Sequence, residues 1–140
     1  MKRSGKLQAA FAKRTGRLDY RSELAHSYVD LGELTRGLDD LEKAVNIQRA
    51  VLDQLVALVE EKPELQIPRF DLARACGELG EIEREAGNPA KGDQLLVKSL
   101  EVLAKLLTEN PASEEFLYQK ARRLAALAQA RRDGGKRVDA

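Results

Sequence analysis

The stretch that decides the fold is DLARACGELGEI at residues 71–82, because it places two glycines inside an otherwise helical pattern. A glycine in a helix interior costs about 1 kcal/mol relative to alanine, so each one needs a physical reason. A second stretch, ELAHSYVDLGEL at residues 23–34, repeats the pattern 48 positions earlier. Gly32 and Gly80 coincide in the two stretches, whereas Gly77 has no glycine counterpart. The recurring glycine predicts a recurring packing geometry.

The same 48-residue spacing relates the rest of the chain without a gap, and residues 48 positions apart are called register equivalents below. The equivalent pairs include Leu52/Leu100, Leu55/Leu103, Leu58/Leu106, Val59/Leu107, Glu61/Glu109 and Pro63/Pro111. Backward, Leu7 falls on Leu55 and Phe11 on Val59; forward, Ala128 takes the place of the glycine. A fixed period of this size indicates a stack of helical repeats, that is, a solenoid.

Each unit is expected to contain two helices. The predicted helices span residues 20–36, 40–61, 69–86, 89–109 and 114–132, the last ending at Gly134–Gly135. Asp39 or Asp40 is a candidate cap of the second predicted helix. In the next hairpin, Gly87 is typical of a helix end, Asn88 of a cap and Pro89 of a first helical residue. The expected apolar face of the first helix consists of Leu24, Tyr28, Leu31 and Leu34/Thr35.

We therefore expect one all-α domain over residues 1–140, with about two full repeats and a partial repeat at each end. Its parts are a partial second helix (1–15), repeat 1 (20–61), repeat 2 (68–109), a first helix of repeat 3 (114–133) and a flexible tail (134–140). Small residues at helix crossings let backbones approach. The predicted packing residues are Leu31, Gly32, Leu79, Gly80, Leu127 and Ala128.

Composition agrees with this fold class. Leu and Ala supply 41 of the 140 residues and tryptophan is absent, which is typical of helical domains. Cys76 is the single cysteine, which excludes an internal disulfide and favours a reducing compartment. No apolar run approaches the roughly 18 residues of a membrane span, and the start has no signal-peptide pattern. We expect a cytoplasmic location.

The net charge of +1 is unevenly distributed. Residues 1–21 carry seven basic residues against one acidic (net +6), residues 22–115 ten against twenty (−10), and residues 116–140 seven against two (+5). Two interpretations stay open: solvated ends around an acidic body, or basic ends that meet an acidic partner, a nucleic acid or a neighbouring copy.

These residues resemble the tetratricopeptide repeat, in which a large residue precedes Leu-Gly, a small residue follows and a proline closes the unit. The matching positions are Tyr28, Leu31, Gly32, Ala44 and Pro63, then Cys76, Leu79, Gly80, Gly92 and Pro111, then Leu124, Leu127 and Ala128. The period of 48 exceeds the family standard of about 34. Tyr20–Arg21 and Pro68–Arg69, each followed by Leu-Ala, look like long-period arrays of large bacterial multidomain proteins. The chain is expected to be a relative or a fragment of such an array.

The resemblance implies an antiparallel helix-hairpin solenoid whose first helices line a concave groove for a peptide or partner protein. The implied groove positions are His26, Val29, Glu33, Arg36, Arg74, Gly77, Glu81, Arg84, Arg122, Ala125 and Gln129. At Gly77 the groove would gain room for a ligand backbone, or the glycine is simply tolerated. The Lys/Asn/Arg clamp with which one family subset holds chaperone carboxylates is absent, since its positions are Val29/Glu33, Gly77/Glu81 and Ala125/Gln129.

No catalytic, cofactor-binding or metal site is predicted. His26 is the only histidine, Cys76 aligns with core positions, and no phosphate loop, HExxH or CxxC motif occurs. We expect a non-catalytic protein-interaction module or scaffold. The alternatives are a self-associating assembly domain that uses its exposed repeat ends, or a piece of a larger signalling protein. Nucleic-acid binding through the arginines of RRLAALAQARR (122–132) is disfavoured, because no aromatic is interleaved and the body is acidic. No membrane partner is expected.

Overall fold

The computed structural model describes residues 17–139, with side chains placed for residues 20–133. Its helices are α2 (Arg17–Gly37), α3 (Leu41–Glu61), α4 (Gln66–Glu85), α5 (Pro89–Glu109) and α6 (Glu114–Asp139). No strand occurs in this part of the chain, so the all-helical class is confirmed. The partial helix expected at residues 1–15 lies outside the described residues.

The ends of the helices follow the turn signals of the sequence. Asp40 caps α3, and its carboxylate accepts a hydrogen bond from the Lys43 backbone amide at 3.2 Å. Pro89 begins α5 after Gly87, whose φ is +92°. Asp39, the register equivalent of Gly87, also has a positive φ of 65°. Asp tolerates this left-handed conformation better than most side chains do, so both hairpins can use the same turn geometry.

The end predicted for the last helix is corrected by the structure. We expected α6 to stop at 132 before Gly134–Gly135, but its backbone stays helical to Asp139. Gly87 ends α4 because the chain must turn there and Asn88–Pro89 starts the next helix. The residues after Gly135 include no proline, and a glycine inside a helix costs only about 1 kcal/mol.

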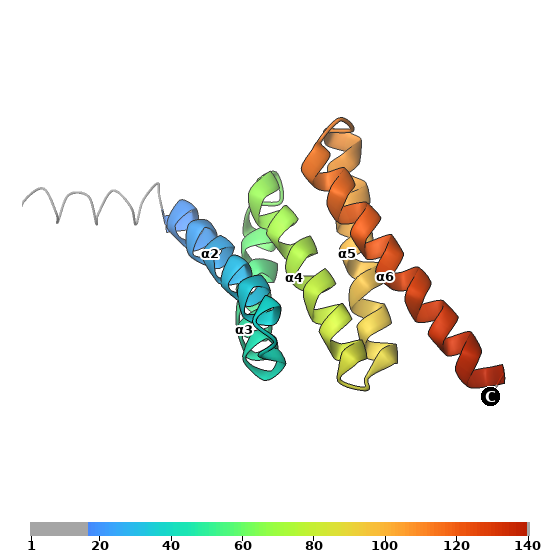
Figure 1. Ribbon diagram of the computed structural model, residues 1–140. Helices are drawn as coiled ribbons and strands as arrows, with labels where there is room; N and C mark the ends of the chain where they lie inside the picture. The colour runs from blue at the N-terminus through green and yellow to red at the C-terminus, as the bar shows by residue number, and fades with distance from the viewer. Residues whose placement is uncertain (1–16, 140) are drawn as a thin grey trace, which may run out of the picture.

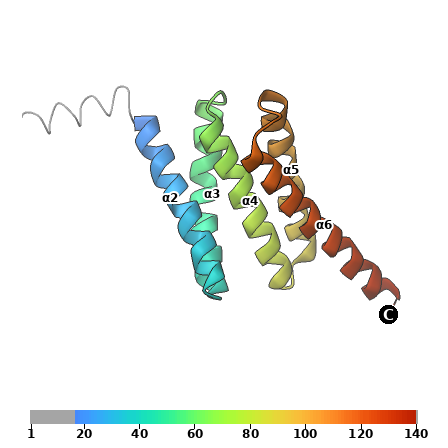
Figure 2. The same cartoon turned by 45° about the horizontal axis from the view of Figure 1, so that its top comes forward.

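The helices lie in two layers (Figure 1). In the first layer α2, α4 and α6 lie side by side, and in the second layer α3 and α5 lie behind them; the turned view shows the same arrangement (Figure 2). Helix α4 packs against each of the other four described helices. It is therefore the element that joins the two hairpins to each other and to α6.

Burial on α4 reflects this central place. Every residue from Asp71 to Gly80 is buried. One side of α4 enters a core cluster with α2 and α3, and another enters a second cluster with α5 and α6. The first cluster contains Ala25, Val29, Val51, Leu55, Leu58, Leu72, Ala75 and Cys76, and the second contains Ala73, Leu103, Leu106 and Phe116.

The apolar face expected for the first helix is wrong for α2. Its buried residues are small or short: Ser22, Ala25, Val29, Gly32 and Thr35. The large residues Leu24, Tyr28, Leu31 and Leu34 are exposed instead. The physical reason is that no described helix packs over these side chains. Ala128 on α6 is exposed for the same reason, whereas Leu79 and Leu127 are buried.

Gly80 lies where α4 and α5 cross. A Cβ built on Gly80 would lie 2.8 Å from the Gly92 carbonyl oxygen and 3.1 Å from the Leu96 backbone nitrogen. Both obstacles are backbone, which cannot rotate away. In the first hairpin, a Cβ on Gly32 would lie 2.5 Å from the side-chain amide nitrogen of Gln48, which is the register equivalent of Leu96. The recurring glycine therefore makes space for the second helix of its own hairpin.

We predict that Gly80→Ala lowers the free energy of unfolding by about 1–3 kcal/mol, because the added methyl group forces the two backbones apart. Gly37→Ala is the matched control, since nothing lies within 4 Å of a Cβ at that glycine. It should leave stability unchanged or raise it by up to about 1 kcal/mol. Urea denaturation followed by circular dichroism measures both, and equal effects of the two substitutions would contradict the crossing geometry.

Candidate functional site

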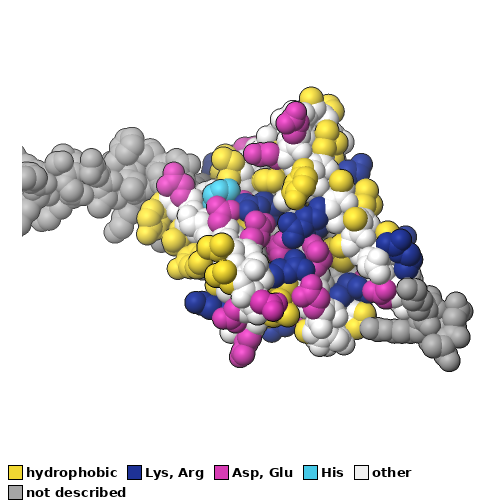
Figure 3. Space-filling model, viewed as in Figure 1, with side chains coloured by type: hydrophobic (Ala, Val, Ile, Leu, Met, Phe, Trp, Pro, Cys, Tyr) yellow, Lys and Arg dark blue, Asp and Glu magenta, His cyan; other side chains and the backbone are white. Residues whose placement is uncertain are grey.

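A hollow of about 900 Å³ lies on the face formed by α2, α4 and α6. Its lining comes from all three helices: Glu23, His26 and Asp30 from α2, Ile67, Phe70 and Arg74 from α4, and Glu115, Tyr118 and Gln119 from α6. In the space-filling view this face carries a cluster of charged side chains with hydrophobic groups above it (Figure 3). The hollow is thus built by residues far apart in the sequence.

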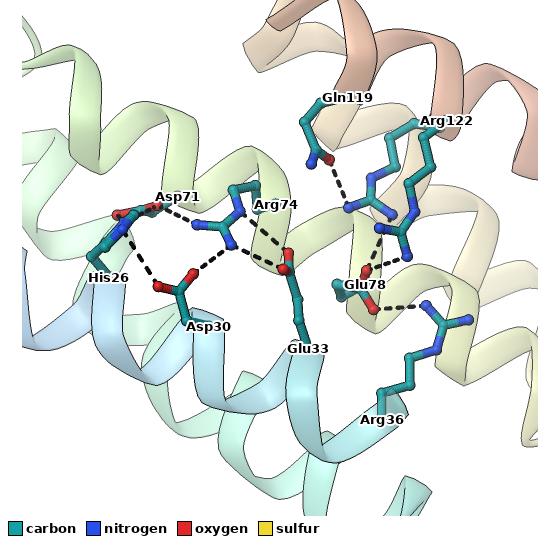
Figure 4. Close-up of polar contacts among 10 residues, drawn as sticks. His26, Asp30, Glu33, Arg36, Asp71, Arg74, Glu78, Gln119 and Arg122 are labelled. Atoms are coloured by element: carbon teal, nitrogen blue, oxygen red, sulfur yellow. Dashed lines mark hydrogen bonds and ion pairs between the residues drawn. The ribbon is translucent and has the colours of Figure 1, made fainter. Parts of the chain in front are cut away.

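Arg74 is the centre of the charged cluster on the α2 side. Its guanidinium donates to Asp30 at 2.6 Å and Glu33 at 2.9 Å, both on α2. It also donates to Asp71 one turn earlier on α4, at 3.1 Å. The Nδ1 atom of His26 lies 2.9 Å from both Asp71 carboxylate oxygens (Figure 4). Five polar side chains therefore join α2 to α4 at the hollow.

Glu78 is the centre of the ion pairs that join all three first-layer helices, α2, α4 and α6. Its carboxylate is 1% exposed and accepts from Arg36 of α2 at 2.7 Å and from Arg122 of α6 at 2.6 Å (Figure 4). Removing one member of a buried ion pair leaves the other charge unpaired, at a typical cost of about 3–5 kcal/mol. Glu78 therefore holds α2 and α6 to α4 at the same point.

Arg123 is a fully buried charge of the site, with the same 0% exposure as Asp71. It donates to Glu81 of α4 and, at 2.9 Å, to Gln119 one turn earlier on α6. Its Nε has no hydrogen-bond partner among the described residues. Burial lowers the pKa of Arg123, and the charges of Glu78 and Glu81 offset only part of that effect.

Gly77 is explained by Arg123. A Cβ built on Gly77 would collide with the Nε, Cζ and Cδ atoms of the Arg123 side chain. The glycine that lacks a register equivalent is thus the residue that leaves space for a buried guanidinium from α6. This replaces both sequence-based readings of Gly77, room for a ligand backbone and simple tolerance.

The pKa directions agree with charges that stay paired. Burial would lower the pKa of Arg74, but the hydrogen bonds that it donates to Glu33 and Asp30 raise the pKa well above its usual range. Arg36 behaves in the same way with Glu78 and Glu85. Burial raises the pKa of the Asp71 carboxyl, and His26 and Arg74 counter part of that shift. Arg36 and Arg74 therefore serve as fixed positive charges that connect helices.

The ion pairs repeat with the 48-residue register. Arg74 pairs with Asp30 and Glu33, and its equivalent Arg122 pairs with Glu78 and Glu81. Arg21–Glu61 recurs as Arg69–Glu109, and Arg36–Glu85 recurs as Arg84–Asp133. The sequence repeat is therefore also a repeat of contacts between helices.

The structure brings the predicted groove positions together on one face, but most of their charges are paired with one another. His26, Glu33, Arg36, Arg74, Glu81, Arg84 and Arg122 all take part in ion pairs, and Gln129 hydrogen-bonds to Arg132 and Asp133. Val29 is buried in the core and Ala125 is exposed. The residues that stay open to a ligand are instead on the rim of the hollow.

Sequence reasoning missed the rim residues Glu23, Glu115 and Tyr118 and the buried partners Asp71 and Arg123. A signal did exist for the ion pairs. Basic or imidazole side chains recur at the equivalents His26, Arg74 and Arg122, and carboxylates recur at Asp30/Glu78 and Glu33/Glu81. Recurring opposite charges on neighbouring helices predict pairing between repeats.

Cys76 is 3% exposed, and burial raises the pKa of its thiol to about 11. Within residues whose side chains are placed, no group of three or more His, Cys, Asp or Glu residues could hold a metal ion. Among the described helices none has both the length and the apolar character needed to cross a membrane.

Comparisons with protein-family models, curated proteins and solved structures found no match to this chain. The internal repeat is therefore the comparison on which the functional argument depends.

We predict that Gly77→Ala lowers the free energy of unfolding by about 1–3 kcal/mol, because it displaces the buried Arg123 side chain. In an Arg123→Ala background the same substitution should be neutral or stabilising by up to about 1 kcal/mol. A double-mutant cycle by urea denaturation, on variants that keep a helical circular dichroism signal, measures the coupling. Additive effects would show that Gly77 and Arg123 are independent.

We predict that Cys76 reacts with Ellman's reagent at pH 8 at least about tenfold more slowly in the folded chain than in urea. A thiol whose pKa is raised to about 11 is almost wholly protonated at pH 8, and the thiolate is the reacting form. The folded-state rate should rise as the pH increases towards 11. Equal rates in the folded and unfolded chains would contradict the buried position.

Proposed function

We propose that this chain is a non-catalytic protein-interaction module of the tetratricopeptide type, whose helix hairpins stack as a solenoid and bind a peptide or partner protein in the hollow between α2, α4 and α6. The single observation that carries the proposal is the open hollow of about 900 Å³ on a face whose helices are tied together by buried ion pairs. A site on rigidly connected elements binds without a large ordering cost.

The lining of the hollow indicates the chemistry of the ligand. Asp30, Glu23 and Glu115 supply carboxylates, and neither Glu23 nor Glu115 forms an ion pair with the described residues. Arg74, the guanidinium in the lining, is already paired with three carboxylates. The hollow therefore favours a segment that brings its own cation, a Lys or Arg side chain.

The apolar part of the lining favours a hydrophobic side chain beside that cation. Ile67 and Tyr118 are each more than 60% exposed on the rim. Phe70 lies beneath them, with its ring centroid 5.1 Å from that of Phe116 and the Arg74 guanidinium 5.9 Å from its centroid. Exposed aromatic and aliphatic side chains at a concave site are common anchors for peptide recognition.

A protein ligand is supported over a nucleic acid by the state of two of the α6 arginines. Arg122 and Arg123 are paired with Glu78 and Glu81, so their charges are already neutralised. Phosphate binding would need these guanidinium groups to be free. The proposal includes a cytoplasmic location, which is supported by the single cysteine of the sequence.

Self-association is a second candidate function, and it is favoured by one observation. The large apolar residues of α2 are exposed along one side of the helix. Contiguous exposed apolar residues often mark an interface.

We predict that selection from a phage-displayed library of random peptides enriches sequences with Lys or Arg beside a bulky apolar residue. Glu115→Lys combined with Tyr118→Ser should weaken the selected peptide by at least about tenfold, because it removes both rim anchors. Fluorescence anisotropy with the labelled peptide measures the affinity.

Glu101→Lys is the matched control. Glu101 is exposed on α5 in the other layer, and its substitution changes the charge by the same amount as Glu115→Lys does. It should leave the affinity of the peptide unchanged. The proposal would be overturned by a selection that enriches no peptide, or by a peptide that binds the rim variant and the parent chain equally.

A further inference from the structure

Helix α2 carries an exposed apolar stripe that the hollow does not use. The α2 stripe, as we call it, consists of Tyr20, Leu24, Tyr28, Leu31 and Leu34, each at least 38% exposed. Their spacing of three and four residues places them on one side of the helix. A hollow of about 320 Å³ between α2 and α3, lined by Tyr28, Ile47 and Ala50, continues this surface.

The molecule itself shows what covers such a stripe. The register equivalents on α4 are Pro68, Leu72, Cys76, Leu79 and Ile82, and all of them are buried. Leu72 and Cys76 lie in one core cluster with Val51, Leu55 and Leu58 of α3, and Val59 packs against that cluster. The cover is therefore the second helix of the preceding hairpin.

Two further equivalents repeat this arrangement. Phe116 on α6, the equivalent of Tyr20, is buried in a cluster with Leu103 and Leu106 of α5. Leu95 on α5, the equivalent of Ile47, packs against the cluster that α3 and α4 form. A helix with the apolar pattern of α3 is thus the occupant that both the stripe and the adjoining hollow require.

The sequence contains that pattern at the required distance. The residues 48 positions before Leu55, Leu58 and Val59 are Leu7, Ala10 and Phe11. The chain from Phe11 to Tyr20 has the same length as the chain from Val59 to Pro68. Residues 1–21 carry a net charge of +6 beside a body of −10 over residues 22–115, so the segment and the body attract each other.

We propose that residues 7–11 of this chain cover the part of the α2 stripe formed by Tyr20, Leu24 and Tyr28, in the position that α3 takes on α4. The cover ends there, because Arg3 occupies the register position of Val51 and would not bury well beside Leu31. This inference is independent of the ligand of the hollow.

Disulfide trapping in the full chain tests the proposal. In a Cys76→Ala background, Leu7→Cys with Tyr28→Cys copies the Leu55–Cys76 pair, and Phe11→Cys with Leu24→Cys copies the Val59–Leu72 pair. Gln8→Cys with Tyr28→Cys is the matched control, since its equivalent Val56 is exposed on α3. After mild oxidation of a dilute sample, we expect an intramolecular disulfide in each copied pair to form at least about tenfold faster than in the control. Non-reducing electrophoresis and mass spectrometry measure it.

Each other result would overturn the proposal. Equal trapping of the control pair would mean that the segment has no fixed position on α2. Disulfide-linked dimers alone would mean that a second copy of the chain covers the stripe. Absence of any cross-link would mean that neither residues 7–11 nor a second copy covers it.

Hydrogen exchange gives a second readout that does not depend on introduced cysteines. Phe11→Asp should speed amide exchange in residues 20–29 by at least about tenfold and leave α5 unchanged, because burying the carboxylate is costly. Gln8→Asp should leave both regions unchanged. Unchanged exchange in Phe11→Asp would contradict the proposed cover.

Discussion

The structure depends on one constraint, which is that α4 has no side that faces water over Asp71–Gly80. A charged side chain on such a helix must find a partner inside the protein or destabilise it by several kcal/mol. Asp71, Arg74 and Glu78 all find theirs on the neighbouring first-layer helices. The position of α2 and α6 is therefore specified by the direction of charged groups as well as by apolar burial.

The same constraint explains the two glycines of the central helix. Gly80 allows the α5 backbone to approach from one side, and Gly77 allows the Arg123 guanidinium to approach from another. One glycine serves packing within a hairpin, and the other serves packing between hairpins. A helix that is enclosed on every side has little room for side chains. It therefore has glycine, which has no side chain, at the points where a neighbour comes closest.

The sequence predicts the local features well and the relations between helices less well. Capping residues, prolines and periodicity are short-range signals, and they place α2 to α5 within three residues of their expected bounds. Residues such as Leu24 and Tyr28 have a helical apolar period, yet which side of α2 is buried depends on the neighbours present. The sequence analysis placed Arg74 and Glu81 in a ligand-binding groove. Helical periodicity shows on which face of a helix a residue lies, but it does not give the distance from that residue to the next helix. Gly77 could not be explained from its own surroundings in the sequence, because its reason is the side chain of Arg123 on another helix.

The recurring ion pairs give the row of first-layer helices a direction. On α4, Arg74 pairs with carboxylates of the helix before it, whereas Glu78 accepts from Arg122 of the helix after it and from Arg36 of the helix before it. Reversing the order of the helices would place Arg74 opposite Ala126 and Gln129, which carry no charge, so the charges specify order as well as proximity. At the acid positions α6 carries Ala126 and Gln129, and at the base position α2 carries His26. Among the described helices, ion pairs at these register positions therefore join α2 to α4 and α4 to α6.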